Sequence, residues 1–299
     1  MIVVTTPTGH IGSRLVEGLL GEGERVRVIA RKPENLAPGV RERVEVVQGS
    51  NDDEAVLDRA LAGADAFFHC VPPNFAAPDV DAYYLRLTRL AIAAMKKNKV
   101  ERVVTVSATG RGVDLEAGVV SSSFRKDAAL EEAGLHVRAL WCPGFFENML
   151  RAIPTLRAQG AFFEPARADL RRPYVATRDI AATAARLLRD RSWTGPGGVA
   201  VLGPEDLSLT DMAAILSEVL GRPIRYQQVP AEGYKAQLLQ YGASEDMAQG
   251  LIDMYAAKDQ GLDSTPPRDA ENTTPTSFRA WCTEVLLPAM ASDAPAAGH

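Results

Sequence analysis

The residues best suited to chemistry lie near the start of the chain, where residues 6–12 read TPTGHIG. Their spacing is that of a dinucleotide-binding turn, GxTGxxG, with Thr6 in place of the first glycine. In such a turn Gly9 lets the backbone approach a diphosphate, Gly12 lets the next helix pack closely, and the first helical amides donate to phosphate oxygens. A glycine-containing turn without a ligand is the alternative interpretation. The predicted nucleotide-binding residues here are Thr6, Thr8, Gly9, His10, Ile11 and Gly12.

Two cations, Arg31 and Lys32, follow the second apolar run at residues 26–30. An NAD-preferring site usually has Asp or Glu here, which accepts a hydrogen bond from the ribose 2′-hydroxyl. A guanidinium and an ammonium instead attract a 2′-phosphate, so NADP(H) is predicted in preference to NAD(H). Arg31 as a solvated loop charge is the alternative.

The scaffold that must position these residues is visible in the first half of the chain, where short apolar runs alternate with helical patterns. Between the runs, apolar residues recur at helical spacing, as at Ile11, Leu15 and Leu19. Continuous apolar strands joined by crossover helices predict an α/β fold with a doubly wound parallel Rossmann sheet, covered on both faces. The apolar runs are residues 2–5, 26–30, 44–48, 66–71, 103–108 and 137–142.

The pattern changes after Pro143. Residues 151–175 show little periodicity, and residues 231–290 are mainly helical in pattern. Gly221 is suited to end a helix in the left-handed conformation. Further helices are predicted over residues 179–188 and 210–220, and further strands over residues 199–203 and 224–229. The predicted organisation is a nucleotide-binding domain over residues 1–150 to which 176–203 return, a smaller α/β substrate lobe over 151–175 and 204–290, and a flexible tail over 291–299.

The composition narrows the class of protein. The chain has 299 residues, of which 46% are hydrophobic and 24% charged, and a net charge of −5. A mildly acidic chain without a dense basic block argues against nucleic acid as a partner, and no apolar run approaches a membrane span. Three separated cysteines and four scattered histidines predict neither a disulfide framework nor a metal site. A cytoplasmic protein with a small-molecule ligand is predicted, as a monomer or homodimer.

Four longer strings, together with the first turn, resemble the NmrA-like family, an atypical branch of the short-chain dehydrogenases and reductases. The resemblance implies NADP(H) or NAD at the carboxyl ends of the strands, with a C-terminal lobe closing over the nicotinamide. It also implies that Val71, Pro72 and Pro73 flank the ribose and nicotinamide, that Ser107 ends the fifth strand, and that Pro143 and the residues up to Phe146 edge the substrate cleft. The strings are residues 60–73, 142–150, 171–188 and 201–226.

The YxxxK pair that supplies the proton in conventional short-chain dehydrogenases is absent from this sequence, so the proton donor must be another residue or water. The isoflavone-reductase-like branch has a lysine near the start of the helix after the fifth strand, and an ungapped count places that position at Ser123. Lys126 lies one turn further on and is predicted either to reach the site or to lie on the solvent face. Ser121, Ser122 and Ser123 either supply hydroxyl donors or form the N-cap of that helix. Lys126 and Ser123 are the catalytic candidates.

Aromatic residues suggest where a substrate binds. Asn74 and Phe75 follow the fourth strand and are predicted to lie over the nicotinamide, whereas core packing is favoured for at least one of Tyr83 and Tyr84. An apolar cleft suits a small aromatic molecule. The cleft candidates are Phe145, Phe146, Phe162 and Phe163.

Three functions fit these residues. The favoured hypothesis is an NADPH-dependent reductase of a small aromatic or quinone-like molecule, since an easily reduced quinone takes its proton from water or from a weak donor. The second is a non-catalytic NADP(H) redox sensor that regulates a partner protein, as some relatives in this family do, and the missing tyrosine favours it. The third is a biosynthetic tailoring protein of atypical chemistry.

Overall fold

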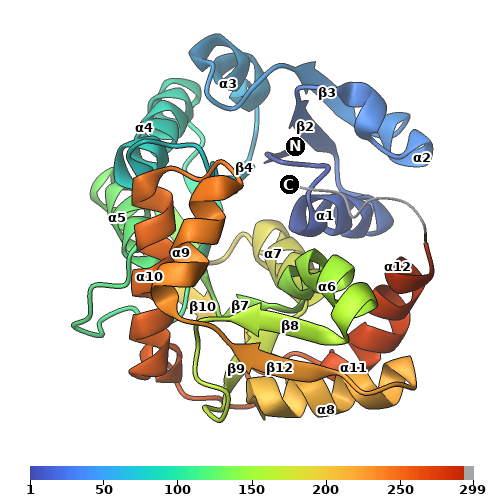
Figure 1. Ribbon diagram of the computed structural model, residues 1–299. Helices are drawn as coiled ribbons and strands as arrows, with labels where there is room; N and C mark the ends of the chain where they lie inside the picture. The colour runs from blue at the N-terminus through green and yellow to red at the C-terminus, as the bar shows by residue number, and fades with distance from the viewer. Residues whose placement is uncertain (293–299) are drawn as a thin grey trace.

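The computed structural model describes residues 1–292, and its largest element is a seven-stranded parallel sheet (Figure 1). The sheet extends from β1 in both directions, so the chain reverses its direction of winding between β1 and β4. This confirms the predicted doubly wound fold, with strand ends within two residues of the predicted ones except for β10, which ends three residues before its predicted end. The strands in spatial order are β10 (Gly198–Ala200), β6 (His136–Cys142), β5 (Arg102–Ala108), β4 (Ala66–His69), β1 (Ile2–Val4), β2 (Val26–Ala30) and β3 (Glu45–Gln48).

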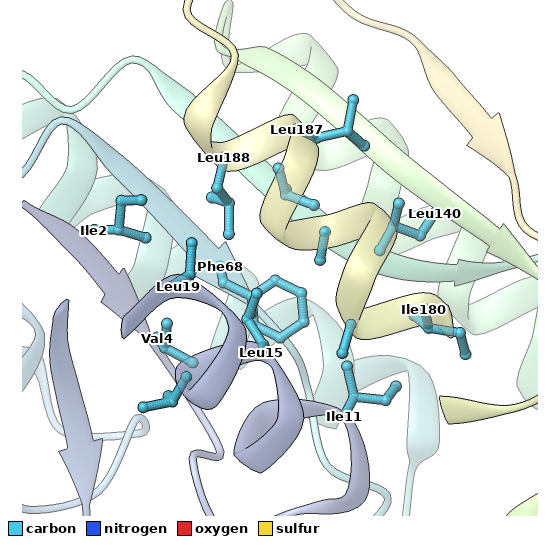
Figure 2. Close-up of a cluster of buried hydrophobic side chains, with 14 of the residues drawn as sticks. Ile2, Val4, Ile11, Leu15, Leu19, Phe68, Leu140, Ile180, Leu187 and Leu188 are labelled. Carbon is cyan, nitrogen blue, oxygen red and sulfur yellow. The ribbon is translucent and has the colours of Figure 1, made fainter. Parts of the chain in front are cut away.

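Helices cover both faces of this sheet because successive strand residues point to opposite sides. Ile2 and Val4 pack with α1 (His10–Gly21) and α7 (Thr177–Arg189), and Figure 2 shows the side chains of α1 and α7 meeting over Phe68. Val3 points the other way and packs with the second layer of helices. That layer consists of α3 (Glu54–Leu61), α4 (Val80–Asn98) and α5 (Val119–Glu132).

A separate cluster of apolar side chains holds the rest of the chain together, with Phe146, Leu216 and Trp281 among its buried members. Its strands form two small sheets, one of β7 (Gly144–Phe145), β9 (Arg172–Val175) and β11 (Asp206–Leu207), the other of β8 (Ala161–Glu164) and β12 (Arg225–Gln228). The helices in this part of the chain are α6 (Ile153–Gln159), α8 (Leu209–Leu220), α9 (Ala231–Gln240), α10 (Glu245–Asp259), α11 (Phe278–Trp281) and α12 (Leu287–Ala291). Shorter segments are η1 (Pro33–Asn35), α2 (Pro38–Arg41), η2 (Phe146–Ala152), η3 (Leu262–Ser264) and a π-helix, η4 (Cys282–Leu286).

In the second half of the chain the structure confirms the predicted end of α8, but it also contains elements that the sequence pattern did not predict. Helix α8 ends at Gly221, which has φ of 64° and confirms the predicted C-cap. Residues 151–175, whose sequence shows little periodicity, form α6, β8 and β9. These strands have four residues each and pair with segments remote in sequence, β8 with β12 and β9 with β11, so the local pattern carries little signal. The domain division stays a prediction, and of the predicted tail only residues 291 and 292 lie within the described part, the first of them ending α12.

Two further findings concern the described residues, 1–292. No helix there is both long and apolar enough to cross a membrane. No group of three or more His, Cys, Asp and Glu side chains there is arranged to hold a metal ion.

Candidate active site

The predicted nucleotide turn lies between β1 and α1, at the carboxyl end of β1. Thr6 has φ of 50°, a left-handed conformation that glycine adopts more readily, which explains why glycine is usual at this position. A Cβ atom on Gly12 would lie 2.0 Å from the backbone oxygen of Thr6, so the helix packs against the turn at a distance that only glycine permits. The structure therefore shows the close approach of the helix to the turn that the spacing of Gly12 predicts.

The first turn of α1 is suited to an anion. Gly9 is its N-cap and has no side chain to satisfy the first amides, and no acidic residue lies in the first turn. The amino end of a helix dipole attracts negative charge, so this arrangement fits a diphosphate. Thr8 and His10 are exposed, whereas the Ile11 side chain is buried in the core, so Ile11 can contribute its backbone alone.

Four neighbouring strands end beside this turn. Because β6, β5, β4 and β1 are adjacent and parallel, the residues that follow them meet at one edge of the sheet. At this edge lie Cys142, the last residue of β6, with Pro143 after it, Ser107 near the end of β5, and the loop 71–73 after β4. Arg31 and Lys32, both exposed, follow β2 on the other side of β1. The structure thus brings the predicted cofactor residues to a single edge.

Thr5 joins two of these strand ends. Its hydroxyl donates to the carbonyl of Phe68 at 3.0 Å and accepts from the amide of Cys70 at 2.9 Å, so the ends of β1 and β4 are held in fixed relation. The Thr5 side chain is fully buried. Sequence reasoning missed this residue, although a threonine ending an otherwise apolar strand was a usable signal.

Hydrogen bonds from α4 and from the start of α10 hold the loop after β4. Tyr83 donates to the carbonyl of Pro72 at 3.1 Å, and burial raises the pKa of Tyr83. The amide of Ser244, at the start of α10, donates to the carbonyl of Phe75 at 2.8 Å. The Arg151 guanidinium lies 5.6 Å from the centre of the Phe75 ring, and the Asn74 carboxamide oxygen accepts from the amide of residue 76. Asn74 and Phe75 therefore lie between the sheet edge and α10.

Helix α10 also approaches the start of α5 closely. A Cβ atom on Gly118, which has φ of 51°, would lie 2.0 Å from the backbone oxygen of Gly250. Gly118 is the N-cap of α5 and provides no side-chain cap, while the hydroxyl of Ser121 accepts from the amide of Ala117 at 2.9 Å. The serine run is thus not the N-cap; it lies within the first turns of the helix.

Lys126 is completely buried, with 1% of its side chain exposed, so the prediction of a solvent-facing position is wrong. Its ammonium donates to Thr105 Oγ1 at 2.7 Å and to the carbonyl of Val106 at 2.9 Å, and it pairs with Asp127 Oδ1 at 2.7 Å. The other oxygen of Asp127 accepts from the hydroxyl of Ser107. The ammonium is therefore held by two hydrogen bonds and one ion pair, and its charge is linked to Ser107 through Asp127.

A neutral histidine lies near this ion pair. Burial and, to a lesser extent, the charge of Lys126 lower the pKa of His69 to about 3. His69 Nε2 lies 3.2 Å from the hydroxyl of Thr88, and Nδ1 has no hydrogen-bond partner within the described residues. Burial raises the pKa values of the Cys70 and Cys142 thiols, so these groups are protonated near neutral pH.

The aromatic candidates divide between the site and the core. Phe145 is half-buried in β7, directly after the sheet edge. Phe146 is 2% exposed and packs against Phe278 and Trp281, so it belongs to the core next to Phe145 and not to an exposed surface. Phe162 is also buried, 5.2 Å from the ring of Tyr226, while Phe163 is half-buried.

Sequence reasoning found Lys126 and Ser107 but missed Asp127 and Thr105, which connect them. Asp127 directly follows Lys126, and adjacent helix residues do not ordinarily face each other, so the ion pair had no spacing signal. Ser123 is half-buried one turn before these residues. The site therefore contains a buried Lys126–Asp127–Ser107 chain beside the predicted nucleotide turn.

Comparison with known proteins bears on this arrangement. The chain is 34% identical over 241 residues, 80% of each chain, to the (4-alkanoyl-5-oxo-2,5-dihydrofuran-3-yl)methyl phosphate reductase of Streptomyces griseus. It is 30% identical over 269 residues, 86% of each chain, to the NAD(P)H azoreductase of Xenophilus azovorans.

Solved structures show the same fold. An NADPH-dependent quinone oxidoreductase from Escherichia coli superposes with a TM-score of 0.77 at 23% identity, covering 96% of this chain and 100% of that one. The triphenylmethane reductase of Citrobacter sp., complexed with NADP(H), has a TM-score of 0.76 at 19% identity, covering 94% of this chain and 98% of that one. The model of the NmrA-like family matches residues 1–281. The chain therefore belongs to the NmrA-like family.

Proposed function

We propose that this protein is an NADPH-dependent reductase of a small aromatic or quinone-like molecule. The observation that carries the proposal is the amino end of α1, which has no side-chain cap or acidic residue and packs against the turn at Thr6 and Gly12 beside the switch point of the sheet. Two relatives at 30% identity or more that cover 80% and 86% of this chain are both reductases by name, and one of them is an NAD(P)H azoreductase.

The residues of the turn hold the diphosphate in this proposal, and Arg31 and Lys32 hold the 2′-phosphate. Both cations are exposed after β2, and no acid stands in the two positions that they occupy. A bound NADPH supplies the hydride. NAD(H) is the less favoured cofactor because it lacks the phosphate that these two cations attract.

The protein's part in the reaction is to orient the reactants and to manage the proton. Lys126 is buried and is held by two hydrogen bonds and an ion pair, so we assign it a positioning role through Asp127 and Ser107. The half-buried hydroxyl of Ser123 is the proposed proton donor. A quinone-like acceptor places little demand on such a donor, because its reduced form is stable and takes protons readily from water.

The substrate is proposed to lie between the nicotinamide and the residues Asn74, Phe75 and Phe145, with Phe146 supporting Phe145 from the core. The loop 71–73 and Pro143 then border the nicotinamide. We also propose a cytoplasmic protein that acts as a monomer or homodimer on a small molecule and not on nucleic acid.

The test pairs nucleotide binding with turnover. Calorimetry should show tighter binding of NADPH than of NADH, and Arg31→Ala should remove the preference. Gly12→Ala should abolish NADPH binding, whereas Gly18→Ala on the same helix, where a Cβ meets nothing within 4 Å, is the matched control and should bind normally. Equal affinities for the two nucleotides would contradict the role of Arg31.

Turnover is measured as NADPH oxidation with a panel of quinones and azo dyes. Ser123→Ala and Lys126→Ala should each lower kcat while leaving the Kd for NADPH unchanged, with circular dichroism to verify folding. Full activity in both variants would exclude them from the reaction. Tight NADPH binding without turnover of any substrate would favour the redox sensor, and substrate consumption without NADPH oxidation would favour the tailoring protein.

A further inference from the structure

A cavity lies in the C-terminal half of the chain, beside β9. Its volume is about 230 Å³, enough for a small molecule, and β9, β11 and η3 all contribute to its wall. Its apolar lining includes Leu202, Pro173 and Pro266. Its charged lining residues are Arg171, Arg172, Lys258, Arg268, Asp206 and Asp263.

Arg172 is the central group of this cavity, with 5% of its side chain exposed. Its Nε donates to the hydroxyl of Tyr174 at 3.1 Å, but neither Nη1 nor Nη2 makes a hydrogen bond. The nearest carboxylate oxygen, on Asp259, is 3.6 Å from Nη1 and beyond hydrogen-bond distance. Asp259 accepts instead from the amide of Arg167 at 3.0 Å. The outer edge of the Arg172 guanidinium is therefore buried without an acceptor.

The other acids near the cavity are already engaged. Asp263 pairs with the ammonium of Lys258 at 2.7 Å, and Asp206 pairs with Nη2 of Arg268. Arg268 Nη1 is buried and has no hydrogen-bond partner, like the two nitrogens of Arg172. Two guanidiniums lining one cavity thus have three buried nitrogens without acceptors.

Glu164 does not change this picture, since burial raises the pKa of its carboxyl to about 7, against the opposing pull of Arg172 and Lys258. Near neutral pH much of that carboxyl is therefore uncharged. Leaving buried guanidinium donors unsatisfied is costly, and a bidentate oxyanion is the group that satisfies them best.

We infer that this cavity binds a small ligand through an oxyanion, a phosphate or a carboxylate, held by Arg172 and Arg268. The apolar wall at Leu202 and Pro266 accommodates a short carbon skeleton attached to that oxyanion. The inference does not depend on the proposed reductase function, because it concerns a different cavity and different residues.

The cavity wall is nevertheless connected to the sheet edge. The hydroxyl of Thr109 donates to Asp263 at 2.6 Å, and the amide of Gly110 donates to the carbonyl of Thr265 at 2.8 Å. Thr109 and Gly110 directly follow β5, the strand that carries Ser107. The ligand therefore lies against a segment that is hydrogen-bonded to the loop next to the candidate active site.

The test measures anion binding to the nucleotide-free protein. Sodium phosphate is titrated calorimetrically and in thermal unfolding, against sodium chloride of equal ionic strength. Phosphate should bind and raise Tm beyond the effect of chloride. In Arg172→Met and in Arg268→Gln the Kd for phosphate should rise by at least about tenfold, the equivalent of one charge-assisted hydrogen bond. Arg189→Gln, which removes a surface guanidinium elsewhere, is the matched control and should behave as wild type.

Additional measurements identify the class of anion that binds and keep the test decisive if one variant does not fold. Acetate and phenyl phosphate distinguish a carboxylate from a phosphate and a bare anion from an ester. If Arg172→Met does not fold, Arg268→Gln decides the question alone. Phosphate binding that is absent, or that persists unchanged in the variants because the anion binds at α1, would overturn the inference. Loss of NADPH binding would leave this result intact, so the two proposals fail separately.

Discussion

Two buried cations in this molecule, Lys126 and Arg172, differ in the hydrogen bonds that their surroundings provide. Lys126, beside the sheet edge, makes two hydrogen bonds and an ion pair of 2.7 Å with Asp127. Arg172, in the wall of the cavity beside β9, has its Nε satisfied and its two terminal nitrogens without hydrogen bonds. Their exposed side-chain fractions are nearly equal, 1% and 5%, so burial does not distinguish them. The two cations differ instead in whether protein oxygens lie within hydrogen-bond distance of their charged terminal nitrogens.

The difference indicates two uses for a buried positive charge. A cation whose charged group is held by protein oxygens is part of the scaffold, and it acts by orienting its neighbours, here Asp127 and Ser107. A buried cation in a cavity wall whose terminal nitrogens make no hydrogen bond lacks an acceptor from the protein itself. Three measurements can break or sharpen this distinction.

The largest effect is expected at Lys126. Lys126→Met leaves the Asp127 carboxylate buried without its counter-ion, so the free energy of unfolding should fall by about 3–5 kcal/mol. Urea denaturation measures the change. The double variant Lys126→Met/Asp127→Asn removes the uncompensated charge and should recover most of the loss. A loss below about 1 kcal/mol in the single variant would show that this pair is not part of the scaffold.

A smaller effect is expected from pH, through His69. Its pKa is about 3 in the folded protein and 6.5 as a reference for the unfolded chain, so the unfolded chain binds the extra proton. Stability from this residue is complete above pH 6.5 and falls with decreasing pH by about 1.4 kcal/mol per unit, or about 2 kcal/mol at pH 5. Urea denaturation from pH 8 to 5 should show the slope in wild type and a weaker slope in His69→Gln. Equal slopes would mean that His69 is protonated in the fold.

The smallest effect on stability is expected at Arg172. In chloride buffer Arg172→Met loses the hydrogen bond to Tyr174 but also removes two unsatisfied donors, so the free energy of unfolding should change by no more than about 1 kcal/mol. The same urea experiment as for Lys126→Met makes the two values directly comparable. A loss as large as that of Lys126→Met would place both cations in the scaffold and remove the distinction.

Much of the fold and part of the site could be read from local pattern. The strands β1, β2 and β5 and the turn around Gly9 have continuous signals, because each is specified by residues adjacent in the chain. Strand β8 could not be read in this way, because its pairing partner β12 lies more than 60 residues further on. Asp127 was missed for a similar reason: its importance depends on contacts with Ser107 and Lys126 inside the core.

The order of residues alone determined the parallel sheet, its glycine turn and the cations after β2, since hydrophobic periodicity and backbone freedom are properties of short segments. Only the tertiary structure decided that Lys126 is buried beside protein oxygens, whereas the terminal nitrogens of Arg172 are buried without a hydrogen bond. Whether a charge finds an acceptor depends on which remote segments pack around it, here β5 around the first and η3 with α10 around the second.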